Sequence, residues 1–73
     1  MNATIERKLT LPDAIRQEMQ RCRELIATYD EVGPVGNFAR VAIGEAVRQA
    51  EAAVASGDVV AMIDSLRTMQ RCE

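Results

Sequence analysis

Apolar residues that recur every three or four positions, interrupted by two glycine-containing corners, constrain this fold more than any other feature of the sequence. The first series, with steps of 4, 4, 3, 4 and 3, consists of Leu11, Ile15, Met19, Cys22, Ile26 and Tyr29. This spacing predicts a helix over residues 11–32 with one apolar face. Arg21 and its polar neighbours fall on the opposite face, which we expect to meet solvent. Thr10 followed by Asp13 is typical of a helix start, and Pro12 is tolerated in the first turn.

A second helix is expected at residues 34–56, after the corner at Gly33-Pro34. Glycine past a helix end accepts the left-handed conformation, and proline is favourable at a first helical position. Alanines at steps of three and four run through this helix and would let two helix axes approach to roughly 8 Å; they are Ala39, Ala42, Ala46, Ala50 and Ala53. Further apolar residues widen the arc, so that the helix should touch two neighbours; these are Val35, Phe38, Val41, Ile43, Val47 and Val54.

A third helix is expected at residues 59–72, after a corner in which Gly57 stops one helix and Asp58 caps the next. Its predicted core face consists of Val59, Met62, Ile63, Leu66 and Met69. Because tight corners make neighbouring helices antiparallel, the fold class is all-α, a three-helix antiparallel bundle or a helical hairpin with a third helix folded on. Residues 10–73 form its single domain, and residues 1–9, which lack a helical period, are expected to form a flexible arm.

The two cysteines are expected to be thiols and not a disulfide framework. Cys22 lies on the apolar face of the first helix, which predicts a buried structural thiol. Along the bundle axis, Cys72 is expected at about the same level as residues in the low to middle twenties of the first helix. Cys22 and Cys72 are therefore candidate neighbours. The tetrapeptide MQRC occurs at residues 19–22 and 69–72, but the residues around the two copies do not align, which argues against a repeat.

The segment Gly33-Pro-Val-Gly36 raises the question of a phosphate-binding loop. A nucleoside-triphosphatase loop needs a lysine and a serine or threonine after a strand, and a dinucleotide fingerprint needs a third glycine. Neither pattern is present, so the two glycines are interpreted as a hinge. Gly36 is the less explained of the two, and a close helix crossing or a loose first turn would account for it.

Composition argues against several kinds of chemistry. The sequence has no histidine, the usual general base near neutral pH, and its cysteines and carboxylates lack the spacing of a zinc site. We therefore expect no enzyme, no catalytic or metal-binding residue and no cofactor. Nine basic residues stand against eleven acidic ones, which disfavours nucleic acid as a partner. Neither a signal peptide nor a membrane-spanning run is apparent, which predicts a cytoplasmic protein without membrane contact.

Residues 49–66 fit the spacing of a DNA-binding helix-turn-helix, with Ala53, Gly57, Ile63 and Leu66 at its structural positions. Any tight helical corner favours the same residues, however. The reading helix would expose Val60, Ala61, Asp64 and Ser65, whereas base recognition favours arginine, lysine, asparagine or glutamine. A transcriptional regulator is therefore the alternative function and not the first.

The stretch YDEVGPVGNFARVAIGEAVRQAEAAVASGDVVAM, residues 29–62, resembles a group of small uncharacterised helical proteins encoded by bacteriophages and prophages. The shared features are an aromatic residue before a Gly-Pro corner, an alanine-rich helix and a Ser-Gly-Asp corner before an aliphatic helix. No activity is established for that group, so no functional residue is carried over. The resemblance implies a bacterial or phage cytoplasm and an accessory role.

A chain of 73 residues with one Phe, one Tyr and no Trp has a thin core, which a second copy would reinforce. We therefore expect a homodimer that uses the alanine face of residues 34–56 for helix packing and self-association. The expected function is a small protein-interaction module that binds a host or phage protein, with Phe38, Val41 and Arg40 as its candidate partner surface. Met62 and Met69 fit either core packing or an adaptable peptide groove, and core packing is the commoner use.

Overall fold

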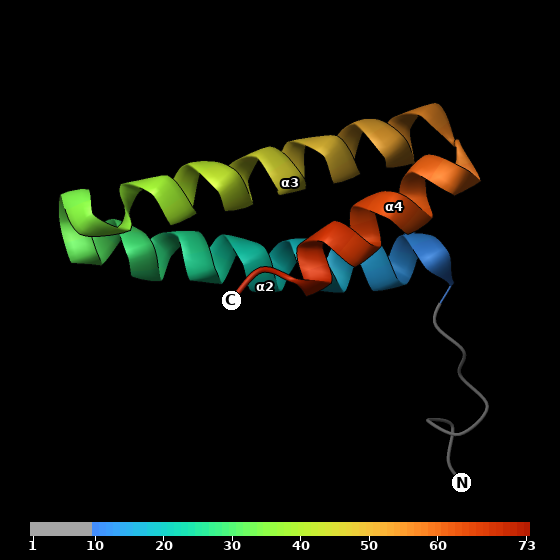
Figure 1. Cartoon of the computed structure of the whole chain (residues 1–73). Coiled ribbons are helices and arrows are strands. Elements are labelled where there is room, and N and C mark those ends of the chain that lie inside the picture. Colours follow the sequence, from blue (N-terminus) through green and yellow to red (C-terminus); the bar gives the residue numbers. More distant parts are fainter. Residues whose placement is uncertain (1–9) are drawn as a thin grey trace, which may run out of the picture.

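The corners at Gly33 and Gly57 separate three α-helices in the computed structural model, which describes residues 10–73. Helix α2 spans Leu11–Val32, the short 3-10 helix η1 spans Gly33–Gly36, and helices α3 and α4 span Asn37–Ser56 and Val59–Gln70. Helices α2 and α3 form a long antiparallel hairpin, and α4 turns back so that the chain ends beside the middle of α2 (Figure 1). The described part of the chain is thus the predicted all-α, three-helix arrangement. The expected arm at residues 1–9 lies outside the described residues.

The helix ends follow the predicted chemistry. The Thr10 hydroxyl accepts a hydrogen bond from the Asp13 N–H at 3.1 Å and caps α2. Both corner glycines have positive φ, 85° at Gly33 and 74° at Gly57, a backbone conformation in which other residues are strained. The Asp58 carboxylate accepts from the Ala61 N–H at 3.2 Å and caps α4. These contacts confirm the predicted starts of α2 and α4 and the two turns of the chain.

Two predicted boundaries are wrong by a few residues. The second helix, expected at residues 34–56, begins as the tight turn η1 and becomes α-helical at Asn37. The space available at Gly36 explains this turn, because a Cβ atom there would lie 2.7 Å from the backbone oxygen of Tyr29. The corner is therefore pressed against the last turns of α2, which is a close crossing that only glycine permits. The third helix, expected at residues 59–72, ends at Gln70.

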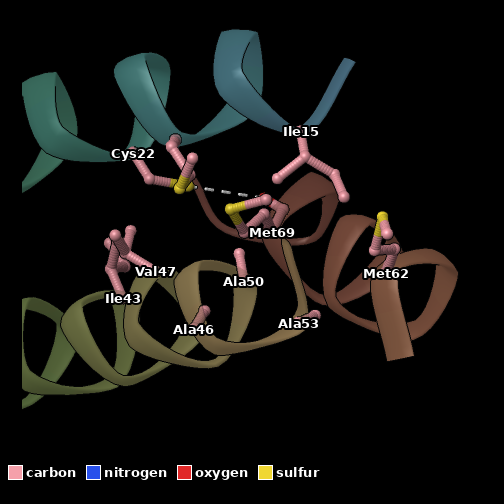
Figure 2. Close-up of a cluster of buried hydrophobic side chains, with 10 residues drawn as sticks. Ile15, Cys22, Ile43, Ala46, Val47, Ala50, Ala53, Met62 and Met69 are labelled. Carbon is pink, nitrogen blue, oxygen red and sulfur yellow. Dashed lines mark hydrogen bonds between the residues drawn. The ribbon is translucent and has the colours of Figure 1, made fainter. Parts of the chain in front are cut away.

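The core lies between all three helices (Figure 2). Ile15 and Cys22 of α2 and Met69 of α4 are fully buried, and they point toward small side chains of α3 such as Ala50. Because alanine projects so little from the helix surface, α3 packs closely against both of its neighbours. The core cluster as a whole consists of Ile15, Met19, Cys22, Ile43, Ala46, Val47, Ala50, Ala53, Met62 and Met69. The two methionines of α4 thus serve as core packing.

The predicted alanine face is divided between core and surface. Ala46, Ala50 and Ala53 are buried, whereas Ala39 is half-buried and Ala42 is exposed. Helix length explains the division, because α4 has 12 residues and α3 has 20, about 18 Å against 30 Å. Helix α4 therefore runs back along only part of α3 and leaves the part nearest η1 uncovered, as Figure 1 shows.

Other residues predicted to pack are exposed. Val35, expected to flank the alanines, is 88% exposed, because it sits in the outer part of η1 beyond the reach of α4. Val59 and Ile63, expected in the core face of the third helix, are 56% and 38% exposed. Compared with the predicted core face, the buried face of α4 is rotated about the helix axis so that it includes Ser65. The Ser65 hydroxyl donates to the Met62 carbonyl at 3.0 Å. That internal hydrogen bond lets a serine occupy a core position.

The three helices together form a thin, elongated molecule. Its principal dimensions are 45 × 30 × 16 Å, and its radius of gyration is 13.8 Å. A compact domain of this length would have a radius of gyration of roughly 11 Å. The two ends of the long axis are therefore covered by fewer neighbouring elements than the middle.

Candidate interaction surface

Four large apolar side chains gather where α2 ends and α3 begins, and we call them the tip surface: Val32, Val35, Phe38 and Val41. Their exposed fractions are 54%, 88%, 86% and 58%. The last three follow one another at steps of three through η1 and the first turns of α3, so they lie next to each other. The tip surface occupies the green end of the hairpin in Figure 1, away from α4.

The predicted partner surface of Phe38, Val41 and Arg40 falls partly on this tip. Phe38 and Val41 point into solvent, but Arg40 turns toward its own chain. Its Nε lies 3.7 Å from the Asp30 carboxylate at the end of α2, and its guanidinium also donates to the side chain of Asn37. Arg40 therefore ties α3 to α2 beneath the tip. Val32 and Val35 were not predicted as surface residues, although their position beside the Gly-Pro corner is a signal that pointed there.

Ala42 adjoins the tip surface on α3. It lies one helical turn after Phe38, on the side of the helix that continues the buried row of Ala46 and Ala53. A large exposed side chain thus stands next to an exposed small one on the same face. Glu45 follows one turn after Val41 and pairs with Arg48.

A second, smaller apolar surface lies at the start of α4, at the other end of the hairpin, and consists of Val59, Val60 and Ile63. We call it the corner surface. The alternative function assigned Val60, Ala61, Asp64 and Ser65 to a DNA-reading face in this region. Val60 and Asp64 are exposed, but Ala61 is half-buried and Ser65 is buried in the core, so half of the proposed face is unavailable.

The two cysteines meet at one backbone carbonyl. The Cys22 thiol donates to the oxygen of Met69 at 3.8 Å (the dashed line in Figure 2), and the backbone N–H of Cys72 donates to the same oxygen at 3.0 Å. Burial, and then the neighbouring Cys72 thiol, raises the pKa of Cys22 from 9.0 to about 11. A thiol with so high a pKa is a poor nucleophile near neutral pH. The raised pKa and the burial agree with the prediction that Cys22 is a buried structural thiol. The shared contact with the Met69 carbonyl places the two cysteines at a similar level along the bundle, as expected from the sequence.

Arg21 has a structural task that its place on the polar face did not reveal. Its guanidinium donates to the backbone oxygens of Met69, at 2.7 Å, and Cys72, at 3.0 Å. Its Nε donates to the Glu18 carboxylate at 3.0 Å. The last carbonyls of a helix have no partner within that helix, and a cation there also complements the helix dipole. Arg21 therefore fastens the end of α4 to the middle of α2.

The same contacts bring the two copies of MQRC together. Arg21 and Cys22 of the first copy bond to backbone oxygens of the second. Met19 and Met69, which open the two copies, are both buried in the core. The repetition thus coincides with a packing contact between α2 and α4, although the flanking residues remain unalike.

Over residues 10–73 the surface forms no pocket, and no three of the residues Cys, Asp and Glu gather as metal ligands would. None of the helices described is long and apolar enough to cross a membrane. The chain matches no family model, no curated protein and no solved structure.

Proposed function

We propose that this protein is a small, non-enzymatic helical module that binds another protein through the tip surface. One observation carries the proposal: Val35 and Phe38 are 88% and 86% exposed and lie side by side at one end of the molecule. Exposed apolar residues scattered singly need no explanation, but a contiguous group of them is typical of a protein-binding surface. Large aromatic side chains are also among the residues that contribute most to binding between proteins.

Two contacts connect the tip to α2. The contact of Gly36 with the Tyr29 backbone and the ion pair between Arg40 and Asp30 hold η1 and the start of α3 against α2. A surface held in one conformation loses less entropy on binding than a mobile loop. The backbone that carries the tip surface is therefore tied to α2 at two points.

The wider role rests on the sequence. The lack of histidine in the whole chain supports a function without catalysis of its own, and the net charge of −2 supports a protein partner over nucleic acid. The resemblance of residues 29–62 to phage and prophage proteins supports an accessory role in a bacterial cytoplasm, with a host or phage protein as the partner. Self-association, which the thin core favours, belongs to the same proposal.

Affinity capture with matched variants tests this function. Immobilised wild-type protein, a Phe38→Ser variant and an Ile63→Ser control are exposed to a bacterial lysate, and each captured protein is then purified and titrated against all three. Phe38 is 86% exposed and Ile63 is 38% exposed, and circular dichroism verifies that both variants keep the helical content of the wild type. We expect binding that Phe38→Ser abolishes and Ile63→Ser leaves intact. Capture and self-association that are both indifferent to Phe38 would contradict the proposal.

A further inference from the structure

We propose that the occupant of the tip surface is a second copy of this chain, bound so that the two α3 helices cross antiparallel on a two-fold axis with Phe38 of each copy over Ala42 of the other. This inference rests on the proposed function, because it names the protein bound by the same surface: a second copy of this chain in place of a host or phage protein. It differs from the self-association expected from the sequence, in which all five alanines took part. Ala46, Ala50 and Ala53 are already used inside the chain.

The area of the surface fits a dimer. Covering an aromatic side chain removes 150–250 Å² from water, so Phe38 at 86% exposure offers roughly 150–200 Å². Together with the three valines, each copy offers on the order of 400 Å² of apolar side chain. Two copies therefore bury at most about 800 Å² from these residues, and polar side chains around them need to supply the rest of the roughly 1,200 Å² at which stable interfaces begin.

The shape of the tip surface and the neighbouring Ala42 is complementary to a second copy of itself. A two-fold axis midway between residues 38 and 42 brings position 38 of one helix opposite position 42 of the other. The large Phe38 side chain then covers the small Ala42 side chain twice, once on each side of the axis. A parallel arrangement would instead set Phe38 against Phe38 and leave the alanines without a large partner. Closed two-fold dimers are also the commonest assemblies of identical chains.

An exchange of the two side chains tests the proposal. Sedimentation equilibrium is measured from micromolar to millimolar concentration for the wild type, Phe38→Ala, Ala42→Phe and the double variant, with circular dichroism to verify equal helicity. Both positions are exposed in the single chain, so all variants should fold. Phe38→Ala should weaken dimerisation by on the order of 1,000-fold, because it removes one hot-spot residue, equivalent to about 30-fold, from each of the two copies. Ala42→Phe should also weaken it, because two phenylalanines then collide.

The double variant should recover a dimerisation constant within about threefold of the wild type, because the large and small partners have only exchanged sides. Ile63→Ala, on the corner surface, should leave the constant unchanged. A monomer at every concentration, a dimer indifferent to Phe38, a dimer weakened by Ile63→Ala, or a double variant that does not recover would each overturn the inference. A monomer whose capture of another protein still requires Phe38 would overturn only the inference and leave the proposed function standing, whereas loss of both would end both.

Discussion

Replacing Arg21 by methionine tests whether one side chain fastens α4 to the rest of the bundle. Methionine keeps most of the aliphatic length of arginine, so packing along the stem changes little. The substitution removes the two hydrogen bonds to the backbone oxygens of Met69 and Cys72 and the bond to Glu18. The Met69 carbonyl in the last turn of α4 and the Cys72 carbonyl just beyond the helix then lose their charged partner.

The expected loss follows from the geometry. A hydrogen bond from a charged group contributes about 1.5–3 kcal/mol when it is shielded from water. The Arg21 side chain is 39% exposed, so we assign each of its two bonds to Met69 and Cys72 about half of that, roughly 1.5–3 kcal/mol in all. A domain of this length has about 3–10 kcal/mol of total stability. At about 4–8 °C per kcal/mol, the melting temperature should fall by on the order of 10 °C.

Thermal and urea unfolding followed by circular dichroism measure this loss, with Arg71→Met as the control. Arg71 occupies the same position in the second MQRC copy, and its side chain makes no hydrogen bond or ion pair with any residue from 10 to 73. The two variants therefore have the same composition and charge. Equal melting temperatures for Arg21→Met and Arg71→Met would refute the idea that Arg21 holds α4 in place.

Three further results are expected. Ala46→Leu should cost about 1–3 kcal/mol in urea unfolding because it overpacks a buried crossing, whereas Ala52→Leu, at an exposed position of the same helix, should change stability by less than about 0.5 kcal/mol. Gly36→Ala should destabilise the chain because its Cβ atom meets backbone, whereas Gly44→Ala, with open space around it, should stabilise α3 by roughly 0.5–1 kcal/mol. Since the pKa of Cys22 is raised from 9.0 to about 11, its proton stabilises the fold fully below pH 9 and progressively less as the pH rises toward 11; a Cys22→Ala variant should lose this part of the pH dependence.

The sequence predicted the helices well because their signals are local. The cap at Thr10, the glycines at 33 and 57 and the cap at Asp58 each depend on residues a few positions away, and all four act as expected. The position of Cys72 along the bundle, level with residues in the low twenties of α2, also followed from the chain length and the positions of the corners alone. These features do not require knowledge of how far one helix extends along another.

The remaining differences come from tertiary geometry that periodicity does not encode. Ala42 and Ala46 have the same residue type and the same spacing, yet only Ala46 is buried, because α4 ends before it reaches Ala42. Arg21 lies on a polar face and still bonds to α4, because the unpaired carbonyls at that helix end lie beside it. Ser65 is buried because its hydroxyl bonds within its own helix. For Ala46 and Arg21 the deciding neighbour is distant in sequence, whereas Ser65 is accommodated by a hydrogen bond to a residue three positions away.

The shortness of α4 has a consequence for how the molecule opens. A helix of 12 residues is near the length at which an isolated helix is marginal in water, so α4 depends on its docking to remain helical. Its backbone amides should therefore exchange with solvent deuterium as one cooperative unit, ahead of those in the longer α2 and α3. Each such opening uncovers Met69 and the alanines beneath it, and it leaves a two-helix form with a second exposed apolar face. Concentrated or warmed samples should accordingly aggregate through this partly unfolded species before the hairpin itself melts.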